Sequence, residues 1–218
     1  MLKIVVFDSG FGGELFADQL EAELPVTEVI RVIDWRNAEI ILTNAKLARK
    51  VAEKALKPYL GKVDLIVFAN YMLSVTSLGY FRRKYKNQKF VGFSLKPKRM
   101  MLSKTTLIMT TKATTKNWKY LMLKYRVKAK TICLDSWPLL IDDGELTSEK
   151  VKTDLSAALS KLKNFLPEQI MLACGQFTEL KPQFREVFGH NARIVDSFRD
   201  TLDDVCKTLK IKTLRKRK

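Results

Sequence analysis

The strongest constraint on the fold is a strand, loop and helix unit that occurs near the N-terminus and again in the second half of the chain. Leu2 to Phe7 is an apolar run with a single lysine, typical of a buried strand, and it enters the loop Asp8-Ser9-Gly10. Thr105 to Thr110 has the same strand character and enters Thr111. A duplicated unit of this kind predicts two similar lobes within one chain.

Each half also contains a second apolar strand that leads into a candidate site. Val63 to Phe68 leads into Ala69-Asn70, and Gln169 to Ala173 leads into Cys174-Gly175 in the same way. Ala69 lies 61 residues after Asp8, and Cys174 lies 63 residues after Thr111. This spacing pairs Asp8 with Thr111 and Ala69 with Cys174. Ligands of open α/β sheets bind beyond the carboxyl ends of the strands. We therefore expect one cleft between the lobes, lined by Asp8, Ala69, Thr111 and Cys174.

Between these strands, helix and strand patterns alternate along the chain. Helical spacing of apolar residues extends from Leu15 to Leu24 and from Leu47 to Leu56, and a further helix is expected from Asn70 to Arg82. Val29 to Ile33 and Phe90 to Phe93 have strand character. The alternation predicts an α/β fold of two pseudo-symmetric lobes, each a mainly parallel sheet flanked by helices, with the active-site cleft between them. The expected division is a first lobe of residues 1–95 with a C-terminal helix at 198–218, a second lobe of residues 96–197, and a basic tail at 207–218.

The charge of the chain is strongly positive and unevenly distributed. Forty lysines and arginines stand against 23 aspartates and glutamates, which leaves a formal net charge of +17, and no carboxylate occurs from Leu65 to Leu134. Such a field attracts nucleic acid or an acidic protein through counterion release. Solvated helix faces are the alternative, and no nucleic-acid-binding motif accompanies the charge. The residues expected to contact a polyanion are Arg82, Arg83, Lys84, Lys86, Lys96, Lys98, Arg99, Arg215, Lys216, Arg217 and Lys218.

Cysteine and histidine usage argues against several classes of protein. Three cysteines without the paired spacing of a zinc site favour a reducing compartment over a disulfide framework or a metal centre. The single histidine, His190, lies in a turn-like sequence. The loop Gly10 to Gly13 lacks the lysine and the spacing of phosphate-binding loops, so we expect no cofactor. No apolar run has the length of a membrane span and no signal peptide opens the chain, which predicts a cytoplasmic protein.

Four segments carry motifs in a fixed order along the chain: Phe7 to Gly13, Ile108 to Tyr120, Pro138 to Gly144 and Ile194 to Ser197. Together they resemble the glutamate racemase family, within the wider aspartate/glutamate racemase superfamily. The first segment, Phe-Asp-Ser-Gly-Phe-Gly-Gly, is similar to the opening motif of that family and is the most specific match. The matches span nearly the whole chain, and the resemblance implies the two-lobed racemase fold.

The resemblance also implies a chemistry that needs two cysteines. Enzymes of the family place one cysteine on each side of the substrate α-carbon, where one thiolate removes a proton and the opposite thiol delivers another. Cys174 matches the second cysteine, whereas Ala69 occupies the position of the first. Asp8 and Cys174 are the expected catalytic residues, and a small amino or carboxylic acid is the expected ligand. By the same resemblance, the substrate-binding residues are Ser9, Asn70, Thr111, Thr114 and Gly175.

Other positions around the expected cleft also depart from the family pattern. Tyr71 stands in place of a small threonine, Gln176 in place of a histidine, and Trp137 in place of a small residue. The Pro-Tyr-Gly substrate loop of the family is not recognisable after Asp34. The family often forms dimers, so a homodimer is compatible with the resemblance, and the sequence leaves the oligomeric state open.

Three hypotheses of function remain open at the level of the sequence. The first is a pseudoenzyme whose basic surface serves binding. The second is an isomerase or decarboxylase that uses Cys174 as its single thiol. The third is residual racemase activity in which Tyr71, or a water molecule held by Asp8, replaces the missing thiol. Alternatively, Cys174 has only a structural role as a small buried apolar residue, which is the role that we expect for Cys133 and Cys206.

Overall fold

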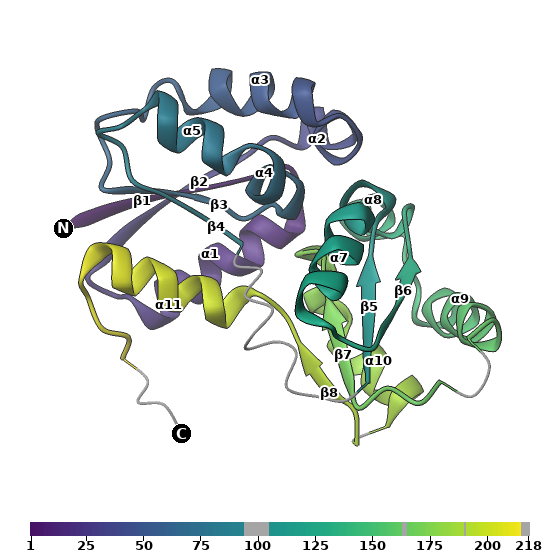
Figure 1. Cartoon of the computed structure of the whole chain (residues 1–218). Coiled ribbons are helices and arrows are strands. Elements are labelled where there is room, and N and C mark those ends of the chain that lie inside the picture. The colour runs from purple at the N-terminus through teal and green to yellow at the C-terminus, as the bar shows by residue number, and fades with distance from the viewer. Residues whose placement is uncertain (94–104, 163–164, 190, 215–218) are drawn as a thin grey trace. The chain divides into compact units, whose positions relative to one another are not determined.

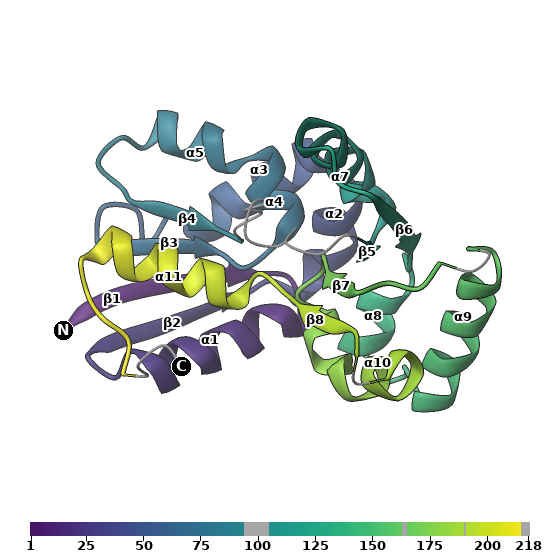
Figure 2. The same ribbon diagram turned by 60° about the horizontal axis from the view of Figure 1, so that its bottom comes forward.

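The computed structural model describes residues 1–93, 105–162, 165–189 and 191–214. The chain divides into two compact units (Figures 1 and 2). Unit 1 consists of Met1–Ser94 and Ser197–Lys218, and unit 2 consists of Leu95–Asp196. The chain therefore leaves unit 1, builds unit 2 as one continuous insertion, and returns to unit 1 for its last helix.

Unit 1 is built on a four-stranded parallel sheet with the strand order β2-β1-β3-β4. Its strands are β1 (Leu2–Asp8), β2 (Thr27–Ile33), β3 (Leu65–Phe68) and β4 (Phe90–Gly92). Its helices are α1 (Phe11–Glu23), η1 (Trp35–Asn37), α2 (Ala38–Thr43), α3 (Ala45–Leu56), α4 (Tyr71–Thr76), α5 (Leu78–Lys84) and α11 (Phe198–Leu209). All residues of β3 are buried, because helices cover both faces of the sheet.

The two faces of this sheet carry different helices. Figure 1 shows α3 and α5 on one side of the sheet and α1 and α11 on the other, and Figure 2 brings the side of α1 and α11 forward. Phe68 and Phe81 pack edge to face in the core beneath α3 and α5. Phe16 of α1 contacts Phe198 of α11, with the two ring centroids 5.3 Å apart. This aromatic contact stabilises the packing of the C-terminal helix α11 against α1.

Unit 2 has a second four-stranded parallel sheet with the order β6-β5-β7-β8. Its strands are β5 (Thr106–Thr110), β6 (Ala129–Cys133), β7 (Gln169–Leu172) and β8 (Arg193–Val195). Its helices are α7 (Lys112–Tyr125), α8 (Trp137–Asp142), α9 (Ser148–Ser160), η2 (Gln176–Leu180) and α10 (Lys181–Phe188). The core of this unit includes Trp137, Phe177 and Phe184. Figure 1 shows α7 on the opposite side of β5 from α9.

The two sheets follow the same path, and the predicted α/β fold class is confirmed. In unit 1, β1 lies between the edge strand β2 and the inner strand β3; in unit 2, β5 lies in the same way between the edge strand β6 and the inner strand β7. The predicted strands are all present, with small shifts at their ends. Among the described residues, no helix combines the length and the apolarity needed to cross a bilayer.

The register of the sheets corrects the internal alignment of the two halves by one residue. Ala69 N–H donates to the carbonyl of Phe7, and Ala173 N–H donates to the carbonyl of Met109, so Ala69 corresponds to Ala173. Pairing in both ladders agrees with this correspondence. The position that corresponds to Cys174 is therefore Asn70, and Asp8 corresponds in the same way to Thr110. The pairing of Ala69 with Cys174 and of Asp8 with Thr111, inferred from sequence spacing, was wrong by one residue.

Two further sequence expectations were wrong. The helix expected from Asn70 to Arg82 is divided into α4 and α5, with Ser77 outside both helices. Hydroxyl groups at the end of α4 hydrogen-bond to backbone carbonyls one turn earlier, as in the 2.7 Å bond from Thr76 Oγ1 to the Met72 oxygen, which favours a bend. Cys133, expected in the core, is exposed because β6 is an edge strand, whereas Cys206 is half-buried.

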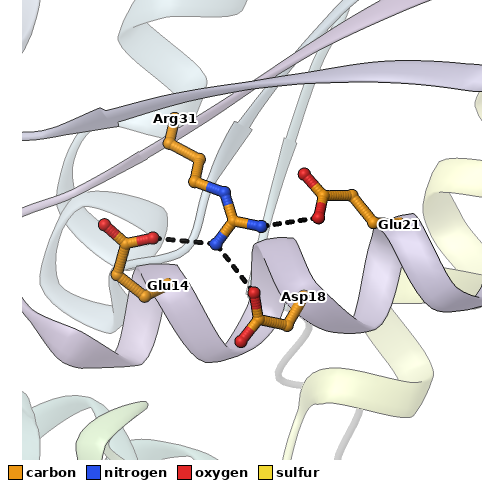
Figure 3. Close-up of polar contacts among 4 residues, drawn as sticks. All are labelled: Glu14, Asp18, Glu21 and Arg31. Carbon is orange, nitrogen blue, oxygen red and sulfur yellow. Dashed lines mark hydrogen bonds and ion pairs between the residues drawn. The ribbon is translucent and has the colours of Figure 1, made fainter.

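An arginine-centred cluster joins the edge strand β2 to helix α1. Arg31 Nη1 donates to Glu14 at 2.9 Å and to Asp18 at 2.8 Å, and its Nη2 donates to Glu21 at 2.7 Å (Figure 3). The three carboxylates lie on one face of α1, at the spacing of successive helical turns. Hydrogen bonds to them, above all to Glu14, raise the pKa of the Arg31 guanidinium. The cluster thus fixes β2 against the helix that follows the Asp8 loop.

Candidate functional site

The carboxyl ends of β1 and β3 bring together a buried polar group in unit 1. Asp8 ends β1, and only 1% of its surface is exposed. Its Oδ1 accepts hydrogen bonds from the backbone N–H of Ser9 at 2.7 Å and from Nδ2 of Asn70 at 2.9 Å. Because β1 and β3 are neighbouring parallel strands, residues that lie 62 positions apart in the sequence meet at one edge of the sheet.

Asn70 has two structural roles at this edge. Its Oδ1 accepts a hydrogen bond from the backbone N–H of Leu73 at 3.0 Å and so caps the N-terminus of α4. Its Nδ2 holds Asp8. The two roles fix the side chain between the helix and the carboxylate. Ala69 is buried beside it and offers only a methyl group.

Helix α1 passes so close to Asp8 that a glycine is required at position 13. A Cβ atom on Gly13 would lie 2.4 Å from the Cβ of Asp8 and 2.8 Å from Cδ1 of Ile33. Gly13 therefore permits packing of the helix against the strand ends. It does not itself indicate a phosphate-binding loop.

Ser9 offers a polar atom that the described part of the chain does not satisfy. The side chain is fully buried, and its Oγ has no hydrogen-bond partner among the described residues. Buried hydroxyl groups in native proteins almost always have a partner. The hydroxyl of Ser9 is therefore available to a ligand or to a water molecule.

In unit 2, the corresponding strand end carries the thiol. Cys174 follows β7 and is 7% exposed. Its Sγ donates to Oε1 of Gln176 at 3.0 Å, and Nε2 of Gln176 donates to Oδ2 of Asp142 at 3.3 Å. An ionised carboxylate can only accept hydrogen bonds, so Asp142 turns the amide nitrogen toward itself and the amide oxygen toward the thiol. This arrangement favours a thiol that keeps its proton, because an amide oxygen cannot take the proton away.

The other expected ligand-binding residues of unit 2 lie at the starts of helices. Thr111 immediately precedes α7, and its side chain does not cap that helix. Thr114 is buried, and its hydroxyl lies 2.8 Å from the hydroxyl of Thr110. Gly175 precedes η2, where its carbonyl accepts from Thr178 N–H at 3.1 Å. The structure thus groups Asp8, Ser9 and Asn70 in unit 1, and places Cys174 and Gly175 at the strand end of unit 2.

Comparison with known proteins identifies the relatives of this chain. No family model matches the chain. The glutamate racemase of Vibrio cholerae serotype O1 is 26% identical over 214 residues, which cover 89% of this chain and 76% of that enzyme. The ordered motifs and the two parallel sheets are consistent with this similarity. The chain is similar to glutamate racemases over most of its length.

Solved structures agree with this placement at the level of the fold. The structure of Escherichia coli glutamate racemase with L-glutamate and an activator, UDP-MurNAc-ala, superposes with a TM-score of 0.82 at 20% identity, and the match covers 97% of this chain and 84% of that chain. Glutamate racemase from Francisella tularensis in complex with D-glutamate gives a TM-score of 0.81 at 16% identity, covering 99% and 84% of the two chains. The racemase fold is therefore retained although few residues are identical.

The sequence analysis did not predict the hydrogen-bond chain from Asp142 through Gln176 to the thiol of Cys174. Asp142 was part of a recognised motif, and Gln176 was noted as a replacement for histidine, but their contact was not expected. The motif around Asp142 was the available signal. In the described ranges, no group of three histidine, cysteine or acidic side chains is arranged to hold a metal ion.

The basic residues expected to contact a polyanion have different environments. Arg82 donates to the carbonyl of Phe90 at 3.0 and 2.7 Å, and Lys84 pairs with Glu53, whose pKa is lowered mainly by that hydrogen bond. Arg83 and Lys86 are exposed. The other basic residues expected to contact a polyanion lie outside the described residues: Lys96, Lys98, Arg99, Arg215, Lys216, Arg217 and Lys218. His190 also lies outside them.

Proposed function

We propose that this protein binds a small amino or carboxylic acid on a racemase fold and lacks two-base racemisation. One observation supports the proposal above all. The end of β3 carries Ala69 and Asn70, and neither side chain can give or take a proton near neutral pH. By family resemblance the lost cysteine lies at Ala69, whereas the register of the sheets makes Asn70 the counterpart of Cys174. The proposal holds for either correspondence.

The remaining polar groups support binding of a ligand that carries both charge and hydrogen-bonding groups. Asp8 offers a buried carboxylate, suited to an ammonium group. Ser9 offers a buried hydroxyl without a partner in the described chain. Structures of two relatives contain D-glutamate or L-glutamate, which makes glutamate the first ligand to test. The cysteine content supports an intracellular location.

The proposal is tested by incubating the protein in deuterated water with each enantiomer of glutamate and aspartate, and with small malonates. Proton NMR reports exchange at the α-carbon, and chiral chromatography reports configuration. We expect binding of a small acid, detectable by calorimetry, without exchange or loss of configuration. Formation of the opposite enantiomer would contradict the proposal and would support residual racemase activity, with Tyr71 or a bound water as the second base.

The contact between Cys174 and Gln176 favours a second candidate function. A thiol that keeps its proton can protonate one face of a carbanion, as a single-thiol isomerase or decarboxylase requires. In a decarboxylase, a malonate loses carbon dioxide and the thiol protonates the resulting carbanion to give one enantiomer of the product. In a single-thiol isomerase, the thiolate form of Cys174 must first remove the α-proton, and return of a deuteron to the same face gives exchange with retained configuration. Both activities should vanish in Cys174→Ser, and their persistence in that variant would exclude the thiol as the acid.

A further inference from the structure

One face of α7 gathers lysines, a tyrosine and a leucine. The opposite face anchors the helix through Trp118, which is fully buried, and through Thr114. At 100° per residue, the outward side chains fall within less than half of the helix circumference. The six exposed residues of this face, called here the α7 face, are Lys112, Lys116, Lys119, Tyr120, Leu123 and Lys124.

Two large apolar side chains lie among these lysines. Tyr120 is 61% exposed and Leu123 is 80% exposed. They lie three residues apart and are therefore neighbours on the helix surface. The ammonium group of Lys124 lies 5.9 Å from the centre of the Tyr120 ring. Single exposed apolar residues are common on protein surfaces, but an adjacent pair surrounded by cations marks a place where a partner can bind.

The charge of the α7 face has little compensation within the helix. No acidic residue occurs in α7, and its first turn, where the helix dipole favours negative charge, carries Lys112 instead. Lys112 pairs with Asp135 at 3.4 Å. Among the described residues, no carboxylate lies within ion-pair distance of Lys116 or Lys119. Exposed Arg126 and Lys128 continue the positive charge beyond the end of the helix.

We propose that the α7 face binds single-stranded nucleic acid. Lysines spread over about 18 Å of helix can follow a sugar-phosphate backbone. The ring of Tyr120 can stack on an unpaired base, and Leu123 can pack against the same base or its sugar. A duplex offers the phosphates but hides the faces of its bases, so the exposed ring favours a single strand. Binding of this kind does not depend on Cys174.

Binding of a fluorescent oligothymidylate of about 15 nucleotides, followed by anisotropy, tests this inference on the full chain. Affinity should fall steeply as salt rises from about 50 to about 200 mM, because binding releases counterions. Tyr120→Ala should weaken binding by about 5- to 100-fold through the loss of stacking, while leaving the salt dependence unchanged. The triple variant Lys116→Gln, Lys119→Gln and Lys124→Gln should lower the slope of log affinity against log salt by about 0.7 for each phosphate that it no longer neutralises.

A matched triple variant on another helix distinguishes binding at the α7 face from attraction by the overall positive charge of the protein. Lys46, Lys50 and Lys54 are exposed along one face of α3, and their replacement by glutamine removes the same number of charges. We expect affinity for the oligonucleotide to change less than twofold in this control. Circular dichroism and thermal unfolding should match the wild type in every variant, since all substituted side chains are exposed.

Four outcomes would overturn the inference. The first is equal loss of binding in the α7 and α3 triple variants, which would indicate a diffuse field. The second is binding of a duplex of the same length as tight as binding of the single strand. The third is an unchanged affinity for the oligonucleotide in Tyr120→Ala. The fourth is binding to vesicles containing phosphatidylserine without binding to the oligonucleotide. The last result would assign the α7 face to a membrane surface.

Discussion

At the scale of single residues, the two strand ends differ in chemistry and in the element that follows: Asn70 caps α4, whereas Cys174 precedes the 3-10 helix η2. Asn70 and Cys174 occupy corresponding positions, two residues beyond the ends of β3 and β7. Asn70 is held by Asp8 and by the first turn of α4, whereas Cys174 is held by an amide. Of these two side chains, only the thiol of Cys174 can supply a proton.

The register predicts which substitution returns a second thiol to the corresponding position. Asn70→Cys, in a background that also carries Gln176→His, should produce detectable conversion of one enantiomer of the bound amino acid into the other. Ala69→Cys in the same background is the matched control and should remain inactive. Loss of the cap should cost Asn70→Cys about 1 kcal/mol of unfolding free energy. Chiral chromatography checks the prediction, and activity in Ala69→Cys alone would favour the alignment with the family over the register.

The hydrogen bond from Cys174 to Gln176 predicts the reactivity of the thiol. In a Cys133→Ser and Cys206→Ser background, iodoacetamide should alkylate Cys174 slowly at neutral pH, because the amide favours the protonated thiol. Gln176→His should speed alkylation about tenfold or more near pH 7, since an imidazole with an ordinary pKa of about 6.5 can take the proton. Mass spectrometry over a pH series measures the rates. Equal rates in both proteins would show that Gln176 does not control the thiol.

At the scale of secondary structure, the strands were predictable and the division of one helix was not. The central strands β1, β3, β5 and β7 are mainly apolar runs of four to seven residues, and their burial on both faces makes that pattern plain in the sequence. The helix after Asn70 divides because hydroxyls near Thr76 compete for backbone carbonyls, which propensity alone does not reveal. The contact between β2 and α1 also depends on side chains that are distant in sequence.

Replacement of Arg31 tests how strongly that cluster joins β2 to α1. Arg31→Met should lower the free energy of unfolding by about 1–3 kcal/mol, because it leaves Glu14, Asp18 and Glu21 close together without their shared cation. Lys3→Met removes the single exposed ion pair of Lys3 with Glu28 and should cost less than about 1 kcal/mol. Urea unfolding at neutral pH compares the two variants. Equal effects would mean that the cluster contributes no more than one surface pair.

At the scale of the whole molecule, positive charge is the dominant property that the racemase fold does not require. The net charge of +17 repels itself in the folded state, and the α7 face concentrates part of it on one helix. A basic surface of this kind is compatible with the α/β fold because strands and helix cores are apolar, so charge on outward faces changes association more than architecture.

Salt should therefore stabilise the protein. Raising sodium chloride from about 50 mM to about 1 M shortens the screening length to about 3 Å and weakens the self-repulsion. We expect the melting temperature to rise by about 2–4 °C, the shift that about 1 kcal/mol produces in a chain of this size. Scanning fluorimetry with sodium chloride and with potassium chloride measures the effect. A fall in melting temperature with both salts would show that attractive ion pairs outweigh the repulsion.

The sequence by itself determined the α/β class, the duplicated unit and the resemblance to glutamate racemases, because apolar periodicity and ordered motifs are local features. It also located Asp8, Asn70 and Cys174 at strand ends. Only the tertiary structure decided that Asn70 is the counterpart of Cys174, since the pairing of strands sets that register. The contact of Asp142 with Gln176 and the exposure of Tyr120 likewise depend on packing between segments distant in sequence.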